Sequence, residues 1–480
     1  MSILVIDVGT SGLRAAVVRP DATIAAEAHR PLLPSSPEPG LVEFDASLMA
    51  RTALDLARAV LAEAGPVDAV GIANQRASTV VWDRATGEPV GPGIGWQDLR
   101  TVGTCLVLQA DGIHVAPNAS ATKVAYLLDL ADPDRTRDLC VGTVDTWLAW
   151  HLSERVVHAT DASNAAVTGL LSGDASGWHD KILGALRIPV GMLPQVVDSS
   201  GVLGAATALD GSPPIAALVG DQQSSLVGQG CVRPGMAKIT FGTGGMLDLH
   251  LGDKRPRFER QGDGGCFPIV AWRRDGVTAW GVEAIMLSAG TNVEWLRDDL
   301  GIIDSAAASH DIASKCASAD GVMYVPALLG LGTPHWDYGA RGTLLGLTRG
   351  SERPQIVRAV LEGVAQRGMD LVEAAEADTG LTIPALRVDG GMSDNPTFLQ
   401  ALADAAQRPV EVSPVREATT LGAAFLAGLA VGTWGGWDDV AATWRPRETV
   451  EPVGSFDRDR WRSAVSRAAE WFPELSTLKF

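Results

Sequence analysis

The sequence predicts a mixed α/β protein of two domains, and three observations support this prediction. The chain has 480 residues, more than one hydrophobic core usually serves. Short apolar runs alternate with helical patterns in both halves. A glycine-threonine loop lies between two apolar runs in each half, at residues 9–11 and 242–244. We therefore expect an N-terminal domain over residues 1–228 and a C-terminal domain over residues 229–480.

In the first half, the predicted elements have recognisable starts and stops. The apolar run Ile3–Ile6 reads as a strand, and Asp45 can cap a helix that stops at Gly65. Two more strands are predicted over residues 70–73 and 79–82, the second followed by a polar turn.

The second half continues the same alternation. Residues 355–373 have helical spacing, and the strand predicted over residues 386–389 is broken by Gly390 and Gly391. Asn395 is then placed at the start of another helix.

Composition excludes several classes of protein. The formal net charge of −18 argues against nucleic acid or an anionic membrane surface as a partner. The chain begins on an apolar strand and contains no run of 18 apolar residues, so we expect a cytoplasmic location. The five cysteines are far apart and form no CxxC pair, which predicts buried thiols rather than disulfides or a zinc site.

The two glycine-threonine loops indicate a divided ATP site. Gly9-Thr10-Ser11 follows a strand that ends near Asp7. Such a turn brings backbone N–H groups and a hydroxyl close to an anion, while the carboxylate could hold a hydrated Mg²⁺. No lysine follows a glycine, which excludes a Walker A loop, and no GxGxxG opens a helix after a strand.

Several blocks of sequence resemble one family. They are Gly71–Arg76, Gly142–Leu148, Gly220–Gln223, Val388–Gly391 and the stretch from Gly342 to Glu362. From Leu4 to about Trp434 the chain resembles the FGGY carbohydrate kinases of the actin-like ATPase superfamily, and within them most closely the glycerol kinase branch. A second signature, around Ser120, Thr122 and Lys123, matches less well, because Tyr126 stands where a tryptophan is usual.

The resemblance implies a fold, a reaction and a set of roles. The fold is two actin-like (ribonuclease H-like) ATPase domains with the active site in the cleft between them. The reaction is transfer of the γ-phosphate of ATP, with Mg²⁺, to an alcohol. Asp221 matches the catalytic base and, with Asp7, the Mg²⁺ contacts. The phosphate contacts are Thr10, Ser11, Arg14 and Thr243, and the adenosine contacts are Gly290, Glu294, Gly391 and Asn395, with Glu294 standing where glutamine is common.

The substrate-binding positions agree with glycerol kinase only in part. Arg76, Trp96, Asp221 and Gln222 match its substrate contacts. Ala77, Asn118 and Met246 stand where it has glutamate, tyrosine and phenylalanine. These changes predict a roomier pocket with a new amide, and therefore a polyol or sugar of four or five carbons, phosphorylated at a terminal primary hydroxyl.

Other functions remain open at this point. The chain could be a true glycerol kinase, or a ketopentose kinase such as xylulokinase, whose branch usually has Gln-Met-His-Gly at residues 74–77. From a different class, it could be a catalytically silent sugar-binding regulator, or a polymerising or chaperone ATPase on the same fold. We expect a small polyol or sugar as ligand and a homo-oligomer, a dimer, with no nucleic acid and no membrane as partner.

Overall fold

The computed structural model describes residues 2–477, and thirteen of the described strands form one long sheet. Its order is β21-β20-β19-β13-β14-β16-β15-β11-β12-β5-β1-β2-β3. The first half of the chain supplies β1 (Ile3–Val8), β2 (Gly12–Val18), β3 (Ile24–Pro31), β5 (Ala69–Asn74), β11 (Ser200–Ala205) and β12 (Pro214–Gly220). The second half supplies β13 (Ala237–Phe241), β14 (Gly245–Gly252), β15 (Phe267–Arg274), β16 (Val277–Met286), β19 (Leu386–Asp389), β20 (Val410–Val412) and β21 (Glu448–Val450).

The two parts of the sheet repeat one local pattern. In the first, β1 and β2 form an antiparallel hairpin and β5 runs parallel to β1. In the second, β13 and β14 form the hairpin and β19 runs parallel to β13. A glycine-threonine loop connects the strands of each hairpin. The predicted α/β class and the recurrence of the loop are therefore confirmed.

The remaining strands form small sheets at the periphery. One contains β4 (Glu43–Phe44), β6 (Thr79–Asp83), β7 (Gly93–Ile94) and β8 (Leu139–Thr143). The others pair β9 (Ala159–Asp161) with β10 (Gln195–Val197), and β17 (Met323–Val325) with β18 (Thr343–Leu345).

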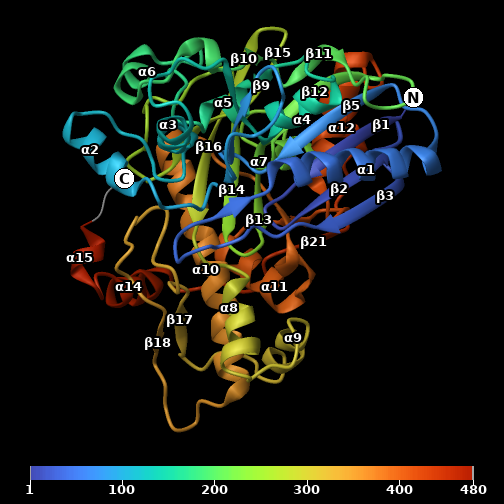
Figure 1. The fold of residues 1–480 in the computed structure, drawn as a ribbon. Helices are drawn as coiled ribbons and strands as arrows, with labels where there is room; N and C mark the ends of the chain where they lie inside the picture. Colours follow the sequence, from blue (N-terminus) through green and yellow to red (C-terminus); the bar gives the residue numbers. More distant parts are fainter. Residues whose placement is uncertain (1, 478–480) are drawn as a thin grey trace.

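Helices cover both faces of the long sheet, as Figure 1 shows. Those of the first half are α1 (Ala46–Ala64), α2 (Val102–Ala110), α3 (Ser120–Ala131), α4 (Val144–Leu152), α5 (Ala162–Ala166), α6 (Asp180–Leu186) and α7 (Asp221–Gly228). Those of the second half are α8 (Thr291–Glu294), α9 (Ala308–Ala313), α10 (Arg353–Thr379), α11 (Pro396–Ala406), α12 (Ala418–Val431), α13 (Trp437–Thr443), α14 (Arg458–Ala468) and α15 (Pro473–Ser476). None of the helices described is long and apolar enough to cross a membrane.

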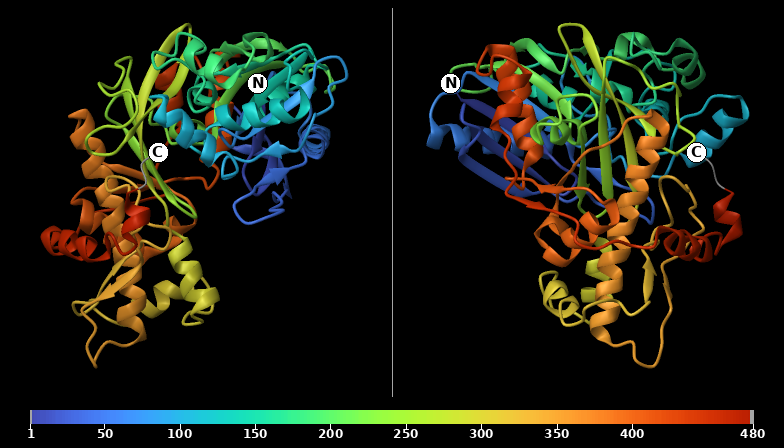
Figure 2. Two further views of the ribbon diagram at one scale, coloured as in Figure 1. Left: turned by 60° about the vertical axis from the view of Figure 1, so that its left-hand side comes forward. Right: turned by 180° about the vertical axis from the view of Figure 1, so that it is seen from behind.

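Alternating side chains of β1 divide the core of the first half. Leu4 and Ile6 pack with α1, whereas Ile3 and Val5 pack with α12, so these helices lie on opposite faces of the sheet. Helix α12 belongs to the second half of the chain, yet it lies beside the strands of the first (Figures 1 and 2). Figure 2 shows α10 running along the second part of the sheet, whose core is separate.

Close helix packing joins the two halves at α7 and α12. A Cβ atom on Gly422 would lie 1.8 Å from the carbonyl oxygen of Ser224, and one on Gly228 would lie 1.9 Å from that of Ala418. Only glycine permits this approach at both positions. The helix that begins at Asp221 is thus fixed against the second half.

The structure confirms the helix ends predicted at Asp45, Gly65 and Asn395, whereas the helix predicted over residues 355–373 is longer, at Arg353–Thr379. The Asp45 side chain accepts a hydrogen bond from the Leu48 N–H at 2.8 Å at the start of α1, and Gly65 ends that helix with φ of 86°. Asn395 caps α11 in the same way. Four of the five free cysteines are buried as expected, and Cys316 is half-buried.

Candidate active site

Three parallel strands of the first half end at one edge of the sheet. The order β12-β5-β1 places Gly220, Asn74 and Val8 in register. The residues beyond these strand ends carry most of the predicted chemistry, because ligands of open α/β sheets bind outside the carboxyl ends of the strands. The sheet therefore brings together Asp7, the loop at residues 9–11, Arg76 and Asp221.

Asp221 is the first residue of α7, directly after β12. Its carboxylate is 28% exposed and lies 3.5 Å from the Nε of Arg76. The Gln222 N–H donates to it at 2.8 Å. Burial raises the pKa of Asp221, and the positive charge of Arg76 opposes this rise without cancelling it. A partly buried carboxylate with a raised pKa at a strand end suits a general base.

Asp7 lies in an environment with excess negative charge. Its pKa is raised to about 7 by burial, then by the nearby charges of Asp221 and Glu417, against the opposing effect of Arg14. A divalent cation would relieve this repulsion, so the site fits Mg²⁺, which commonly takes one or two carboxylates together with phosphates. Among residues 2–477 no group of three or more His, Cys, Asp and Glu side chains could hold a metal by itself.

The first loop connects the expected phosphate and substrate residues. Gly9 donates its N–H to the Gly12 carbonyl at 2.9 Å, which closes the turn. The indole Nε1 of Trp96 donates to the Thr10 hydroxyl at 3.1 Å. Thr10 and Trp96 are therefore in direct contact, while Ser11 is exposed.

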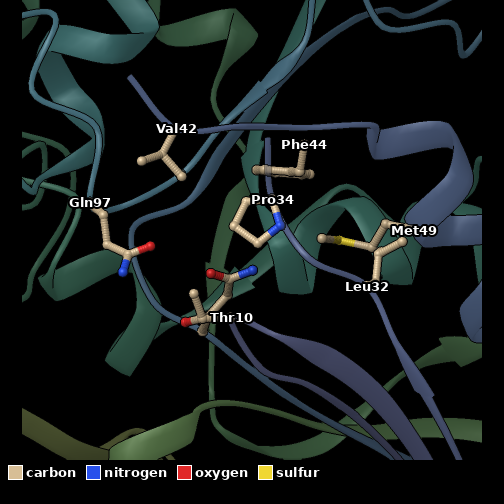
Figure 3. A pocket seen from close by; sticks show the side chains of 9 residues that line it. Thr10, Leu32, Pro34, Val42, Phe44, Met49 and Gln97 are labelled. Carbon is tan, nitrogen blue, oxygen red and sulfur yellow. The ribbon is translucent and has the colours of Figure 1, made fainter. Parts of the chain in front are cut away.

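A small cavity lies beside Thr10 (Figure 3). Its volume is about 10 Å³, and its walls are largely apolar, with Leu32, Phe44 and Met49 among them. This volume corresponds to about one water molecule, so the cavity is too small to accept a polyol or a nucleotide.

Arg14, expected at the phosphates, makes ion pairs within the protein. Its guanidinium lies 2.7 Å from the carboxylate of Glu417 and 3.4 Å from that of Glu27. Glu417 immediately precedes α12, so the first pair connects the two halves of the chain. A phosphate that contacts Arg14 must share the guanidinium with Glu417 or displace it.

The second loop approaches two predicted nucleotide residues. The carbonyl of Gly242 accepts from the Gly290 N–H at 2.8 Å. A Cβ on Gly290 would lie 2.6 Å from the same carbonyl oxygen, so only glycine fits there. Gly390, with φ of 87°, packs equally closely on the backbone of Phe241. Thr243 and Gly391 are both exposed. The structure thus brings Thr243, Gly290 and Gly391 to one edge of the long sheet.

The other two predicted adenosine residues differ from each other. Asn395 is occupied within the protein, since its Oδ1 accepts from the Phe398 N–H at 3.0 Å and its Nδ2 donates to Ser309 at 2.9 Å. These polar atoms of Asn395 are therefore already hydrogen-bonded within the protein. Glu294 is exposed at the end of α8 and available to a ligand.

Three residues expected to contact the polyol differ in their surroundings. Ala77 is 5% exposed with φ of 61°, and its carbonyl accepts from Ser120 at 3.0 Å. Asn118 is exposed and Met246 is half-buried on β14.

Lys123 connects the two backbone segments that carry Trp96 and Asn118, which are both expected to contact the polyol. Its ammonium donates to the carbonyls of Trp96 at 2.9 Å and Asn118 at 3.1 Å. Burial lowers the pKa of Lys123 to about 8, and the two backbone contacts fix the segments relative to each other.

Three residues near the site were missed by the sequence analysis. Glu283 lies 2.7 Å from the Nη2 of Arg76, Lys238 donates to the Gln222 side chain at 2.7 Å, and Glu417 pairs with Arg14. Lys238 and Glu283 are charged residues inside apolar strands, and this pattern could have identified them. Nothing in the local sequence distinguishes Glu417 from a solvent-exposed helix start.

If both loops bind one nucleotide, they should be protected together. Addition of ATP, Mg²⁺ and polyol should close the cleft and slow amide hydrogen exchange over residues 7–14 and 241–245 to a similar extent. Hydrogen exchange followed by mass spectrometry measures this directly. Protection of one loop alone would show that the nucleotide site is not shared.

Comparison with known proteins agrees with this geometry. The family model for the N-terminal domain of FGGY carbohydrate kinases matches residues 2–228, and the C-terminal model matches residues 237–431. The chain is 41% identical to a glycerol kinase of Aromatoleum aromaticum, over 98% of this chain and 99% of that protein. The crystal structure of Plasmodium falciparum glycerol kinase with ADP superposes with a TM-score of 0.90 at 28% identity, covering 100% of this chain and 99% of the other. A xyloylose kinase of Brucella ovis gives 0.84 at 25% identity, covering 100% of both chains. The chain therefore belongs to the FGGY family of carbohydrate kinases, which transfer phosphate from ATP to an alcohol group of a polyol or sugar.

Proposed function

We propose that this kinase phosphorylates the terminal primary hydroxyl of a polyol or sugar of four or five carbons. The observation that carries the proposal is Ala77, a buried residue beside Arg76 that stands where glycerol kinases have a glutamate. A methyl group cannot accept a hydrogen bond. Loss of a bond to a charged acceptor is worth roughly 1.5–3 kcal/mol, so glycerol should bind about 10- to 150-fold more weakly.

The other two departures act in the same direction. Met246 and Asn118 are smaller or more flexible than the phenylalanine and tyrosine of the glycerol kinase branch. The exposed Asn118 side chain offers both a donor and an acceptor to an additional hydroxyl. A longer substrate could fill the space and recover hydrogen bonds that glycerol cannot make.

Asp221 and the two loops supply the chemistry of the transfer. The Asp221 carboxylate accepts the proton of the substrate hydroxyl while the oxygen of that hydroxyl bonds to the γ-phosphorus. The bond from that phosphorus to the bridging oxygen breaks, and ADP leaves. Asp7 and Asp221 would hold Mg²⁺, which neutralises charge on the phosphates when bound. Thr10 in the first loop and Thr243 in the second would each contact the phosphates.

Glycerol is the second candidate substrate, favoured by the names of relatives about 40% identical over the full chain. Xylulose is a weaker candidate substrate, because residues 74–77 differ from those usual in the xylulokinase branch. Retention of Asp221 and both loops argues against a silent regulator. An ADP-release assay over polyols and ketoses of three to six carbons separates these possibilities, since a regulator would show no sugar-dependent turnover.

Restoring the glycerol-type side chains should shift specificity. The triple change Ala77→Glu, Asn118→Tyr and Met246→Phe should move the ratio of kcat/KM values toward glycerol by ~1–3 kcal/mol. Because Ala77 already has a positive φ, glutamate adds little backbone strain there. Steady-state kinetics on both substrates test this. A wild type that prefers glycerol to every longer polyol would contradict the proposed pocket.

The boundary between residues 228 and 229, the dimeric state, the cytoplasmic location and the exclusion of nucleic acid and membrane stay predictions of the sequence. Size measurement by light scattering would test the dimer. The roles given above to individual site residues are part of the proposal.

A further inference from the structure

Three charged side chains form a row across the middle of the long sheet. Lys238, Asp248 and Glu283 lie on β13, β14 and β16, and their relative exposures are 0%, 0% and 6%. Lys238 stands opposite Asp248 in the strand register, and Asp248 stands opposite Glu283. The Lys238 ammonium lies 2.8 Å from the Asp248 carboxylate. We call these three residues the strand-charge row.

Burial of three charges is costly unless each has a partner. The row finds its further partners in the first half of the chain. Glu283 Oε2 lies 2.7 Å from the Nη2 of Arg76, and the Lys238 ammonium donates to the Oε1 of Gln222 at 2.7 Å. These partners, Arg76 and Gln222, are two of the polar side chains that we propose bind substrate hydroxyls.

The contact with Glu283 determines where the Arg76 guanidinium lies. Arg76 is shared between Glu283 at 2.7 Å and Asp221 at 3.5 Å. Without the closer carboxylate, the guanidinium would be free to pair fully with Asp221 and turn away from its present orientation. The Nη1 of Arg76 is buried without a partner among the described residues, which leaves this donor for a substrate or a water.

The contact with Lys238 determines how the Gln222 amide is turned. A lysine ammonium can only donate, so the amide oxygen must face it. The amide NH₂ is then the group left for a substrate oxygen. Lys238 is itself fixed by Asp248 and by the hydroxyl of Thr240 at 2.9 Å.

We infer that Glu283 and Lys238 are positioning residues for the polyol, acting through Arg76 and Gln222. The first half of the chain presents the polyol-binding side chains, and buried charges on strands of the second half hold their orientation. This inference rests on the proposed function, because it requires Arg76 and Gln222 to contact the polyol.

The first test is Glu283→Gln in the full chain. Glutamine keeps the size of the side chain and an oxygen for Arg76, but removes the charge. The KM for the best polyol should rise about tenfold or more, while the KM for ATP stays within about twofold. Glu411→Gln is the matched control. It breaks a part-buried pair, with Arg387 at 3.2 Å, elsewhere in the same sheet, and should leave both KM values within about twofold of the wild type.

A double-mutant cycle tests whether Glu283 acts through Arg76. In an Arg76→Met background, Glu283→Gln should change the polyol KM by less than about twofold. An equal rise in both backgrounds would overturn the positioning role, and so would a matching rise in the KM for ATP. Absence of polyol turnover in the wild type would overturn the proposed function as well. Normal wild-type turnover with an unchanged polyol KM in Glu283→Gln would overturn the positioning role alone.

A second variant covers the case in which Glu283→Gln fails to fold. Lys238→Met combined with Asp248→Leu replaces a buried ion pair by apolar side chains, a change that proteins often tolerate. It frees Gln222 without leaving a lone charge from that pair in the sheet. The polyol KM should again rise several-fold with the KM for ATP unchanged. A folded double variant with wild-type kinetics would contradict the role of Lys238.

Discussion

Asp221→Asn should lower kcat by at least ~10²–10⁴, the usual contribution of a general base, while nucleotide binding persists. The amide keeps the shape of the side chain but cannot accept the proton of the substrate hydroxyl. Both phosphate loops remain in place, so the affinity for ADP measured by calorimetry without Mg²⁺ should change little. Kinetics at saturating polyol and ATP give the effect on kcat.

Asp198→Asn provides the control for Asp221→Asn. The Asp198 carboxylate is 26% exposed, which is close to the exposure of Asp221, and it pairs with Arg273 at 2.8 Å. It lies outside the candidate site. Its turnover should stay close to that of the wild type. Near-normal kcat in Asp221→Asn would rule out Asp221 as the base.

Asp7→Asn should abolish most activity and at the same time stabilise the metal-free protein. Loss of an expected Mg²⁺ contact removes several kcal/mol of charge stabilisation from the transition state. The value of kcat/KM should therefore fall by a factor of at least about 10². Folding forces the Asp7 carboxylate into a site where burial, Asp221 and Glu417 disfavour its charge. At pH 8 in EDTA, the free energy of unfolding of the variant should therefore be about 1–3 kcal/mol higher than that of the wild type.

The gain in stability should depend on pH with a defined sign. The pKa of Asp7 is about 7 in the folded protein and 3.8 as its ordinary value. Below about pH 4, Asp7 is protonated in both the folded and the unfolded protein, so it does not lower the free energy of unfolding. As the pH rises from 4 to 7 the folded wild type loses stability relative to the variant, and above pH 7 the difference is constant. Urea unfolding at several pH values measures it. A variant less stable than the wild type at pH 8, or a difference independent of pH, would contradict this picture.

Local sequence was sufficient to predict much of the fold around the candidate site. Asp45, Gly65 and Asn395 mark helix ends through hydrogen bonds to their own neighbours, so their effect is visible in a few residues of sequence. The strand before Asp221 and the helix after it follow from an apolar run and a polar segment. These signals do not depend on the rest of the chain.

Contacts between the halves could not be predicted in this way. The pairs Arg14 with Glu417 and Arg76 with Glu283 join residues far apart in the sequence, and their partners become evident only once the sheet is assembled. The positive φ of Ala77 is similarly hidden, because alanine carries no local preference for it. Specificity depends on such contacts, so the identity of the alcohol is less accessible to sequence than the family.

Transfer of labelled phosphate gives the most direct test of the proposed reaction. The wild type is incubated with ATP labelled in the γ-phosphate and the best polyol of four or five carbons, and ADP and labelled polyol phosphate are both quantified. We expect one terminally phosphorylated polyol for each ADP, with little ADP formed when the polyol is omitted. Release of ADP without labelled polyol, or at a rate independent of the polyol, would contradict phosphoryl transfer to a sugar alcohol.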